Sequence, residues 1–325
     1  MSVLQFQDRF ATEEDCVRFL FEKRWPEGWL CPKCGNNRCY PIEKRGLYEC
    51  AACRYQASVT AGTILHKTHT SLRKWFLAVY FMTLDKRGIS SVVLEKQLGI
   101  SQKTAWLLLQ KLRKAMGERE AQYKLEGLVE LDECFFLSPR EGGSRRRQKT
   151  KTRVLAGLSL TKEGKPLHIK FKVLPCNDRP HLEQAVESMV APGATVVTNG
   201  LRSYLSLGGK GFLHERVLAG EAKASEKGPW LEVIVSNDKA LIGGTYHGLD
   251  RMNGKHLQAY LDEYAYRFNR RSRPDLIFGR CITALVSCPV WTYRNIVGRQ
   301  AVWGKGQLCK GLSFLSKGDS HKLPK

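Results

Sequence analysis

Apolar residues follow helical spacing in the first 120 residues and a strand-like pattern after residue 125. In the first part, helices are predicted over 71–88 and within 89–116, where Gly99 and the capping residue Ser101 divide the segment into two. In the second part, strands are predicted at 128–136, 153–160, 167–174 and 195–199, with a helix at 181–189 and an amphipathic helix after residue 254. Three strands followed by helix, strand and later helices predict an α/β domain with a mixed sheet.

The chain is strongly basic along its whole length. Its 325 residues include 53 Lys or Arg and 31 Asp or Glu, and residues 1–120, 121–275 and 276–325 carry +8, +7 and +7, which add to +22. A positive field over every segment indicates a long polyanion as partner, most simply nucleic acid, although a merely soluble basic protein has the same charge. No segment offers the roughly 18 apolar residues of a membrane span, and the N-terminus is acidic where a signal peptide is basic. We therefore expect a cytoplasmic protein with no membrane partner.

Four of the eleven cysteines form two CxxC pairs, at Cys31, Cys34, Cys50 and Cys53. Zinc prefers four tetrahedral soft ligands, and two such pairs carried on hairpins make a zinc ribbon. A redox CxxC is the competing interpretation, but two pairs separated by 15 residues favour structural Zn²⁺. The sequence therefore predicts a small zinc ribbon over 14–60, in which zinc is a folding cofactor because the segment has too little core of its own.

The two helices predicted within 89–116 fit a helix-turn-helix in an all-α region over 70–118. Its second helix would present Gln102, Lys103 and Thr104 at the N-terminal end, where such helices meet base edges. Helix pairs of this length are common without DNA. The DNA-binding interpretation therefore depends on the adjacent zinc ribbon and on the charge of the chain.

Two basic clusters are candidates for contacts with DNA phosphates. Segment 138–152 (SPREGGSRRRQKTKT) has no apolar residue and contains Arg145, Arg146 and Arg147, and the last amphipathic helix ends at Arg270 and Arg271. For each of these side chains the alternative is a solvated surface position. The Gly- and Lys-rich end, 299–325, is predicted to be a flexible basic tail.

The strand VELDECFF places Glu130, Asp132 and Cys134 on one face. A carboxylate in the middle of a strand is costly unless it is paired or bound to a metal. Asp132 is therefore either bonded to one of the many arginines or a ligand for a divalent ion. In two-metal phosphoryl transfer, carboxylates from separate strands and a helix hold the ions, and Asp132 fits the position of the first of them.

The order of these features resembles bacterial insertion-sequence transposases of the ISXO type, which belong to the DDE class. The resemblance covers roughly residues 10–300 and rests on the zinc pairs, the VELDE strand, VVTNGLRSYL, SNDKALIGGTYHG and the helix KHLQAYLDEYAYRFNRR. It implies an RNase H-like catalytic domain, here over 125–298, that uses Mg²⁺ or Mn²⁺. It also implies a bacterial, nucleoid-associated protein that binds the terminal inverted repeats of its element and target DNA, as a homodimer or higher assembly.

The resemblance carries site roles onto matching positions of this chain. The first aspartate of the family corresponds to Asp132, and the family's T-D-G motif reads Thr198-Asn199-Gly200 here. The S-N-x-K motif is matched by Ser236-Asn237-Asp238-Lys239, and the following T-x-H-G motif includes His247, a candidate ligand or base. Asn199 departs from the family pattern because an amide oxygen can coordinate Mg²⁺ but brings no negative charge. Glu130, Glu133 and Asp238 are then the alternative carboxylates.

These observations favour a transposase that cuts and joins DNA. The alternative from another class is a catalytically impaired, transposase-derived DNA-binding protein or regulator, to which Asn199 points. A third interpretation, a zinc-ribbon transcription factor with an unrelated C-terminal domain, is disfavoured by Asp132 on its strand and by the family-like last helix.

Overall fold

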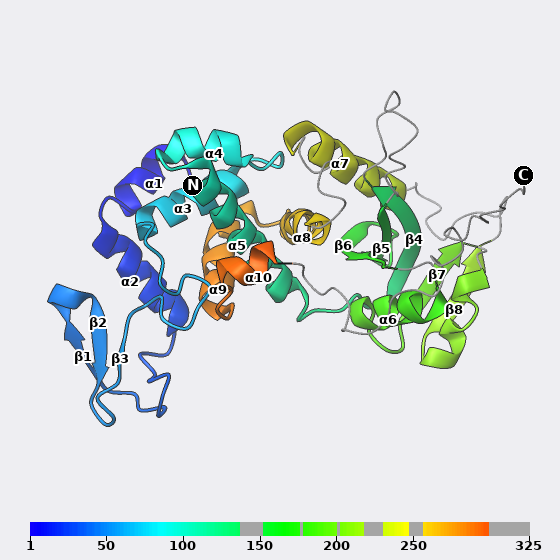
Figure 1. The fold of residues 1–325 in the computed structure, drawn as a ribbon. Coiled ribbons are helices and arrows are strands. Elements are labelled where there is room, and N and C mark those ends of the chain that lie inside the picture. The colour runs from blue at the N-terminus through cyan, green and yellow to red at the C-terminus, as the bar shows by residue number, and fades with distance from the viewer. Residues whose placement is uncertain (137–151, 176–177, 200–201, 218–229, 247–255, 299–325) are drawn as a thin grey trace, which may run out of the picture.

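The computed structural model describes residues 1–136, 152–175, 178–199, 202–217, 230–246 and 256–298. It consists of a helical half that carries a small three-stranded sheet and a second half built around a five-stranded sheet (Figure 1). No helix within these ranges is long and apolar enough to cross a membrane. Residues Arg145, Arg146, Arg147, Gly200 and His247 and the segment 299–325, for which roles or structure were predicted, lie outside the described residues.

The N-terminal region consists of two capped helices followed by the small sheet. Helices α1 (Val3–Arg9) and α2 (Glu13–Arg24) begin at capping boxes made by Ser2 and Thr12. Strands β1 (Cys39–Ile42), β2 (Leu47–Cys50) and β3 (Gln56–Ala57) pair antiparallel, with the 3-10 turn η1 (Glu43–Arg45) between the first two. The short strands and turns predicted between the cysteine pairs are therefore present.

Three further helices follow the small sheet, each with a serine N-cap whose side chain accepts a backbone hydrogen bond. They are α3 (Leu72–Leu84), α4 (Ser91–Leu98) and α5 (Gln102–Glu120). Helix α4 ends at Gly99, whose φ of 57° lies in the left-handed region that glycine adopts without strain. The predicted turn at Gly99 and cap at Ser101 are confirmed, whereas α3 ends four residues before the predicted stop at Gly88 because Asp85 leaves the helical conformation.

The second half contains a mixed five-stranded sheet in the order β6-β5-β4-β7-β8. Its strands are β4 (Leu128–Phe136), β5 (Thr152–Leu160), β6 (Pro166–Val173), β7 (Thr195–Asn199) and β8 (Leu213–Val217). Strands β4, β5 and β6 are antiparallel neighbours, while β7 runs parallel to both β4 and β8. The α/β class with a mixed sheet is confirmed, and β8 is an edge strand that the hydrophobic pattern did not indicate.

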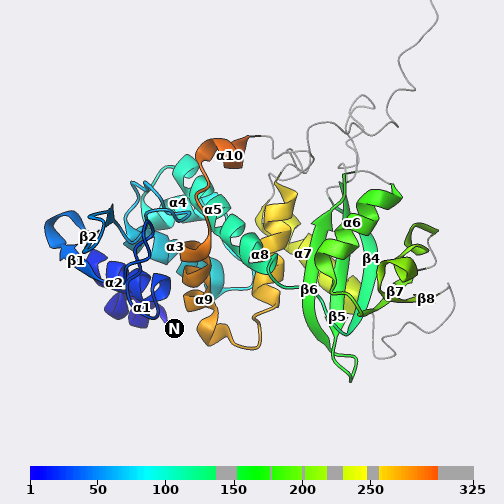
Figure 2. The same cartoon turned by 90° about the horizontal axis from the view of Figure 1, so that it is seen from below.

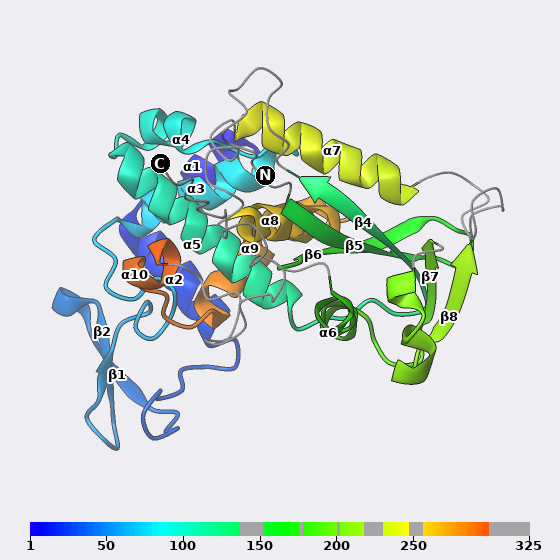
Figure 3. The same cartoon turned by 45° about the vertical axis from the view of Figure 1, so that its right-hand side comes forward.

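Helices cover both faces of this sheet. One face packs on α6 (Arg179–Met189) and on the turns η2 (Arg202–Tyr204) and η3 (Leu207–Lys210). The other face packs on α7 (Trp230–Thr245) and α8 (Leu257–Phe268). Figures 2 and 3 show α6 and α7 on opposite sides of the strands. Val129 and Leu131 point to the α6 side, whereas Cys134 and Phe136 point to the α7 side, as the alternation along a strand requires.

The helix α9 (Pro274–Ser287) packs in the core of the N-terminal helices, and the short α10 (Tyr293–Val297) follows it. Phe278 on α9 lies with its ring centroid 5.9 Å from Phe6, 5.6 Å from Phe10 and 5.9 Å from Phe76. The chain therefore returns to its beginning after completing the sheet. Residues before 118 and after 274 share one hydrophobic core, although the sequence pattern assigns them to different predicted domains.

Candidate active site and zinc centre

The four predicted zinc ligands come together at one end of the small sheet. Cys31 and Cys34 lie in the turn before β1, Cys50 ends β2 and Cys53 lies in the turn after it. All four sulfur atoms lie within 4.8 Å of one another, and the Cys31–Cys53 and Cys34–Cys50 Sγ pairs are each 3.6 Å apart. A tetrahedral zinc with Zn–S bonds of about 2.3 Å requires sulfurs about 3.8 Å apart. The cluster therefore fits one structural Zn²⁺.

The local backbone favours the thiolate form of one of these cysteines, Cys31. Burial opposes ionisation of the Cys31 thiol, but the backbone N–H groups of Cys34 and Lys33 and the neighbouring thiols lower its pKa to about 6. The Lys33 N–H donates to Cys31 Sγ at 3.4 Å. Cys39 lies on β1 opposite Cys50 but is not among the four clustered sulfurs.

Asp132 lies in the middle of β4, the central strand of the sheet, and is half-buried. Its Oδ1 atom accepts the backbone N–H of Glu133 at 2.9 Å. The neighbouring strand β7 runs parallel to β4 in a register that pairs Leu131 with Thr198. Asp132 follows Leu131 and Asn199 follows Thr198, so these two residues lie side by side on adjacent parallel strands.

Asn199 ends β7 and meets Asp132 directly. Its Nδ2 atom donates a hydrogen bond of 3.0 Å to Asp132 Oδ1, although 67 residues separate the two positions in the chain. The first and second positions of the family motif are therefore in contact. The pair offers a metal one carboxylate and one amide, which is the oxygen chemistry that Mg²⁺ and Mn²⁺ accept, with a single formal charge.

Two of the alternative carboxylates, Glu133 and Asp238, lie in surroundings that differ from those of this pair. Glu133 lies on the opposite face of β4, where its Oε2 atom is 2.5 Å from Arg153 Nε and burial raises the pKa of its carboxyl. Asp238 is fully buried on α7, and neither oxygen has a hydrogen-bond partner among the residues that the structure describes. Burial, together with the nearby Glu263 charge, raises the pKa of the Asp238 carboxyl well above its ordinary value. Glu130 shares the Asp132 face of the strand and is half-buried.

Helix α7 carries Asn237 and Lys239 across the face of the sheet that includes Asp132. Both side chains are exposed, and Lys239 Nζ lies 5.5 Å from the centre of the Phe136 ring. Burial raises the pKa of the Cys134 thiol to about 12, with Lys239 opposing that rise and Asp132 and Asp238 adding to it. Cys134 is therefore a neutral thiol, and the Lys239 cation is the charged α7 group facing this part of β4.

The predicted DNA-contacting residues fall into two kinds. Gln102 and Lys103 are exposed on the first turn of α5, while Thr104 is half-buried and its hydroxyl bonds the Ser101 cap. Arg270 is instead held by an ion pair with Glu120 and stacks on Tyr266. Arg271 donates to the backbone carbonyls of Leu167 and Phe268 at 3.0 Å. Both arginines therefore hold elements together in this structure.

A buried ion-pair network joins the two halves of the molecule and was not identified from the sequence. Arg113 on α5 and Glu263 on α8 are each 1% exposed, with Arg113 Nε 2.7 Å from Glu263 Oε2. The Tyr246 hydroxyl donates to Glu263 Oε1 at 3.0 Å, and Arg267 Nη1 donates to the Asp85 carbonyl at 2.8 Å. A Cβ at Gly88 would lie 2.6 Å from the Tyr246 hydroxyl, so this loop requires glycine. No periodic signal marks such a pair, because both partners occupy ordinary polar positions of amphipathic helices.

Comparisons with known proteins agree with the arrangement of the two sites. The model of the ISXO2-like transposase domain matches residues 124–269, and the model of the transposase zinc-ribbon domain matches residues 11–56. An uncharacterized protein in transposable element ISH50 of Halobacterium salinarum is 29% identical over 236 residues, which cover 66% of this chain and 76% of that protein. Residues 124–269 are therefore similar to the ISXO2-like transposase domain and residues 11–56 to the transposase zinc ribbon, which argues against an unrelated C-terminal domain.

A structural similarity to a known transposase complex is distant. The crystal structure of a pre-cleavage Mos1 transpososome aligns with 64% of this chain and 78% of that chain, at 11% sequence identity and a TM-score of 0.23. At that score the similarity carries no argument about this protein.

Proposed function

We propose that this chain is the transposase of an insertion sequence, which binds the ends of its element and cuts and joins DNA at the Asp132–Asn199 pair. The observation that carries the proposal is the hydrogen bond between these two side chains across adjacent parallel strands. Sequence motifs distant in the chain predict that these positions share a metal site, and a contact between them is the geometry such a site needs. The family match over 124–269 supports the same assignment.

We assign the sheet and the helices on both of its faces to an RNase H-like catalytic domain. The order β6-β5-β4-β7-β8, with three antiparallel strands followed by two parallel ones, supports this assignment. The domain limits 14–60, 70–118 and 125–298 remain our proposal for the zinc ribbon, the helix-turn-helix and the catalytic region. Helix α9 completes the core of the middle region although it belongs to the third segment.

We assign end recognition to the zinc ribbon and to helices α4 and α5. The short turn at Gly99 and the exposed first turn of α5, with Gln102 and Lys103, support a helix-turn-helix that reads base edges. Basic residues elsewhere on the +22 chain would contribute affinity through phosphate contacts, which carry no sequence information by themselves. The element ends would be its specific ligand, and chromosomal target DNA its second substrate.

For the chemistry, Asp132 supplies the carboxylate and Asn199 the amide oxygen that would hold a divalent ion, with Asn237 on α7 as the third candidate ligand. Divalent ions in such sites activate the attacking hydroxyl and stabilise the leaving oxygen of an in-line displacement. The protein holds Asp132 on the central strand of a sheet that has helices on both faces. Its carboxylate therefore changes position little during the reaction. The Lys239 cation, facing the same side of the sheet, suits the phosphate next to the reacting bond.

A second candidate function is a DNA-binding protein of transposase origin with impaired catalysis. The specific observation that favours it is again the Asn199 amide, which supplies a hydrogen-bond donor to Asp132 where a metal site needs a second acceptor. A protein of this kind retains zinc and binds the element ends but does not cut them.

A cleavage assay on the element's own ends with Mg²⁺ or Mn²⁺ separates the two functions. The proposed transposase nicks the end-containing duplex, and Asp132→Asn removes the nicking without reducing binding to the ends. Binding without metal-dependent nicking would favour the second function, and an absence of binding would contradict both.

A further inference from the structure

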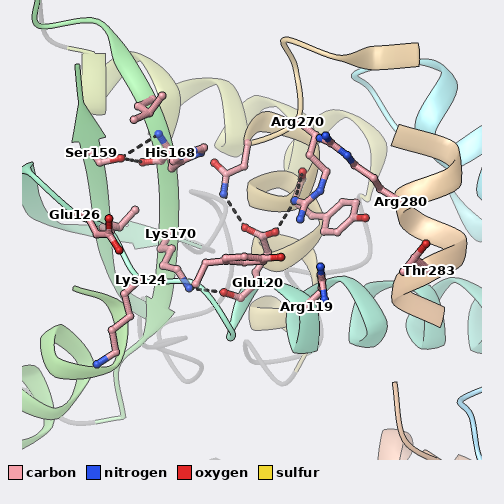
Figure 4. Close-up of a pocket in the computed structure, with 15 residues that line it drawn as sticks. Arg119, Glu120, Lys124, Glu126, Ser159, His168, Lys170, Arg270, Arg280 and Thr283 are labelled. Carbon is pink, nitrogen blue, oxygen red and sulfur yellow. Dashed lines mark hydrogen bonds and ion pairs between the residues drawn. The ribbon is translucent and has the colours of Figure 1, made fainter. Parts of the chain in front are cut away.

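A cleft of about 640 Å³ lies where the two halves of the molecule meet, between the C-terminal end of α5, the edge strand β6 and helices α8 and α9 (Figure 4). It is separate from the Asp132 site. The strand register pairs Val129 with Ser159 and Ser159 with His168, so His168 lies two strands and three residues away from Asp132. With strands about 4.8 Å apart and about 3.3 Å per residue, this separation is roughly 14 Å.

The lining of this cleft has both apolar and polar surface and carries a net positive charge. Two carboxylates, Glu120 and Glu126, face five cationic side chains, so the net charge is +3 with His168 neutral; the cations are Arg119, Lys124, Lys170, Arg270 and Arg280. Sites for small organic ligands are lined mainly by apolar and aromatic groups. The composition of this cleft favours an anion instead.

Buried contacts fix the floor of the cleft. Glu120 is 7% exposed and accepts hydrogen bonds from Asn269 Nδ2 at 2.7 Å and from Arg270 Nη1. Lys170 is 8% exposed and donates from Nζ to the backbone carbonyl of Glu120 at 2.6 Å. The Arg270 guanidinium also lies 3.6 Å from the centre of the Tyr266 ring. Glu120 therefore uses both carboxylate oxygens internally, and its negative charge is compensated within the floor.

The rim carries two arginines that form no ion pair with a described residue, although the Arg280 charge helps to lower the pKa of the Asp275 carboxyl. Arg280 is exposed on α9 and takes part in no ion pair with the described residues. Arg119, at the end of α5, donates to the amide oxygen of Gln122 at 3.0 Å and is likewise outside any described ion pair. Figure 4 shows Arg119 and Arg280 on different elements at the same opening. Two arginines above a compensated floor suit consecutive phosphate groups of a polyanion.

We propose that this cleft binds the phosphodiester backbone of a DNA segment other than the one read at the first turn of α5. The identification of the ligand as DNA rests on the proposed function, whereas the preference for a polyanion does not. Arg119 lies 17 residues after Gln102 on the same helix, which corresponds to about 26 Å along its axis. The N-terminal end of a recognition helix enters the major groove. The other end of α5 is therefore available to a second segment.

The test uses the full chain and a 30-base-pair duplex of random sequence, with affinity measured by fluorescence anisotropy at several salt concentrations. The starting variant is Gln102→Ala with Lys103→Ala, which weakens binding at the first turn of α5. To it are added either Arg119→Ala with Arg280→Ala, or a control, Arg18→Ala, whose side chain is 72% exposed on α2. Thermal unfolding of each variant establishes that it is folded.

The starting variant is expected to retain salt-sensitive binding to the random duplex. Removing Arg119 and Arg280 is expected to weaken that binding at least about tenfold and to reduce the slope of log K against log salt by roughly 1.8, while the control changes neither. The cleft assignment would be overturned if Arg18→Ala weakened binding as much as Arg119→Ala with Arg280→Ala. It would also be overturned if the starting variant no longer bound the duplex. If the unaltered chain bound no DNA, the proposed function itself would fail.

Discussion

The Asn199 side chain donates a 3.0 Å hydrogen bond to the Asp132 carboxylate, and the two residues lie on adjacent parallel strands within the region that matches the ISXO2-like transposase domain. An aspartate at position 199 would place two carboxylates about 3 Å apart, where they repel each other unless a cation lies between them. The asparagine removes that repulsion and, with it, one of the negative charges that attract the cation. The same contact therefore stabilises the protein without metal and would weaken the proposed metal site.

The zinc centre gives the first prediction. The purified chain should contain one tightly held Zn²⁺, and Cys50→Ser should lose it because three thiolates cannot close the tetrahedral site. Metal analysis by mass spectrometry measures the content directly. Cys39→Ser is the matched control, since Cys39 pairs with Cys50 across the hairpin but lies outside the sulfur cluster. Full zinc retention by Cys50→Ser would contradict the assignment.

The second prediction concerns Asp238, which is buried with no hydrogen-bond partner in the described part of the chain and whose carboxyl pKa is raised by burial. The folded state binds this proton more tightly than the unfolded state, so wild-type stability is lost as pH rises from the ordinary carboxyl value toward the raised one. Asp238→Asn cannot ionise. The free energy of unfolding of this variant relative to wild type should therefore increase between pH 4 and pH 8, by about 1 kcal/mol or more.

Chemical denaturation at several pH values measures this difference, with exposed Glu22→Gln on α2 as control. Asp238→Asn should also leave DNA cleavage unchanged, because Asp238 points into the protein interior. A loss of cleavage in a stable Asp238→Asn protein would show that this carboxylate belongs to the reaction.

The third prediction concerns the buried pair Arg113–Glu263 between α5 and α8. Glu263→Gln leaves Arg113 as an uncompensated buried charge, which costs about 3–5 kcal/mol of stability. The exposed pair Arg54–Glu49 offers a comparison, since the Arg54 side chain is 74% exposed and Glu49→Gln should cost less than about 1 kcal/mol. Urea unfolding of the two variants checks the difference. Similar losses would mean that the network does not hold the two halves together.

Particular residues show how far the sequence predicts this structure. Period-two alternation places Asp132 and Cys134 on one face of a strand that has the predicted bounds, and serine caps mark the starts of α3, α4 and α5. Family motifs predict that position 199 meets Asp132, which is confirmed. The same alternation places Glu133 on the opposite face, but it cannot identify Arg153 as the partner of Glu133.

Long-range partners are the main part that the sequence does not reveal. The pattern of α9 indicates a buried face but not that this face contacts Phe6 and Phe10 at the other end of the chain. Arg270 looks like a phosphate ligand because its partner, Glu120, is 150 residues away. Hydrophobic periodicity and charge indicate whether a side chain is buried or paired with an opposite charge. Only the fold determines which residue is its contact partner.

The fourth prediction concerns recognition of the element ends. Because α9 packs in the core of the N-terminal helices, removing residues 1–118 would expose that core, so point variants of the full chain are required. Gln102→Ala with Lys103→Ala should reduce the preference for end sequences over random duplex. It should largely retain the salt dependence, which for about six phosphate contacts is on the order of 10³-fold between 50 and 200 mM.

Competition binding with end and random duplexes checks this preference. Exposed Lys162→Ala, in the turn between β5 and β6, serves as the control. A variant at positions 102 and 103 that still prefers the ends as strongly as wild type would place recognition outside the first turn of α5.

The fifth prediction concerns the stability of Asn199→Asp. Without divalent ions, this variant should unfold at a lower temperature than wild type because two carboxylates then face each other. Added Mn²⁺ should raise its unfolding temperature more than it raises that of wild type, since binding to the folded state stabilises it. Asp132→Asn in the same background should remove this response. An equal response of wild type and Asn199→Asp would mean that position 199 is not a metal ligand.

The most direct measurement is cleavage of a duplex containing the element end, compared among wild type, Asn199→Asp and Asn199→Asp with Asp132→Asn at the same Mg²⁺ concentration. We expect Asn199→Asp to cut one to two orders of magnitude faster than wild type, which corresponds to about 1.4–2.7 kcal/mol of transition-state stabilisation. The double variant should lose the gain, because both side chains act on the same ions. Equal cleavage by wild type and Asn199→Asp, with wild type already cutting efficiently, would contradict the assignment of Asp132 and Asn199 as one metal site.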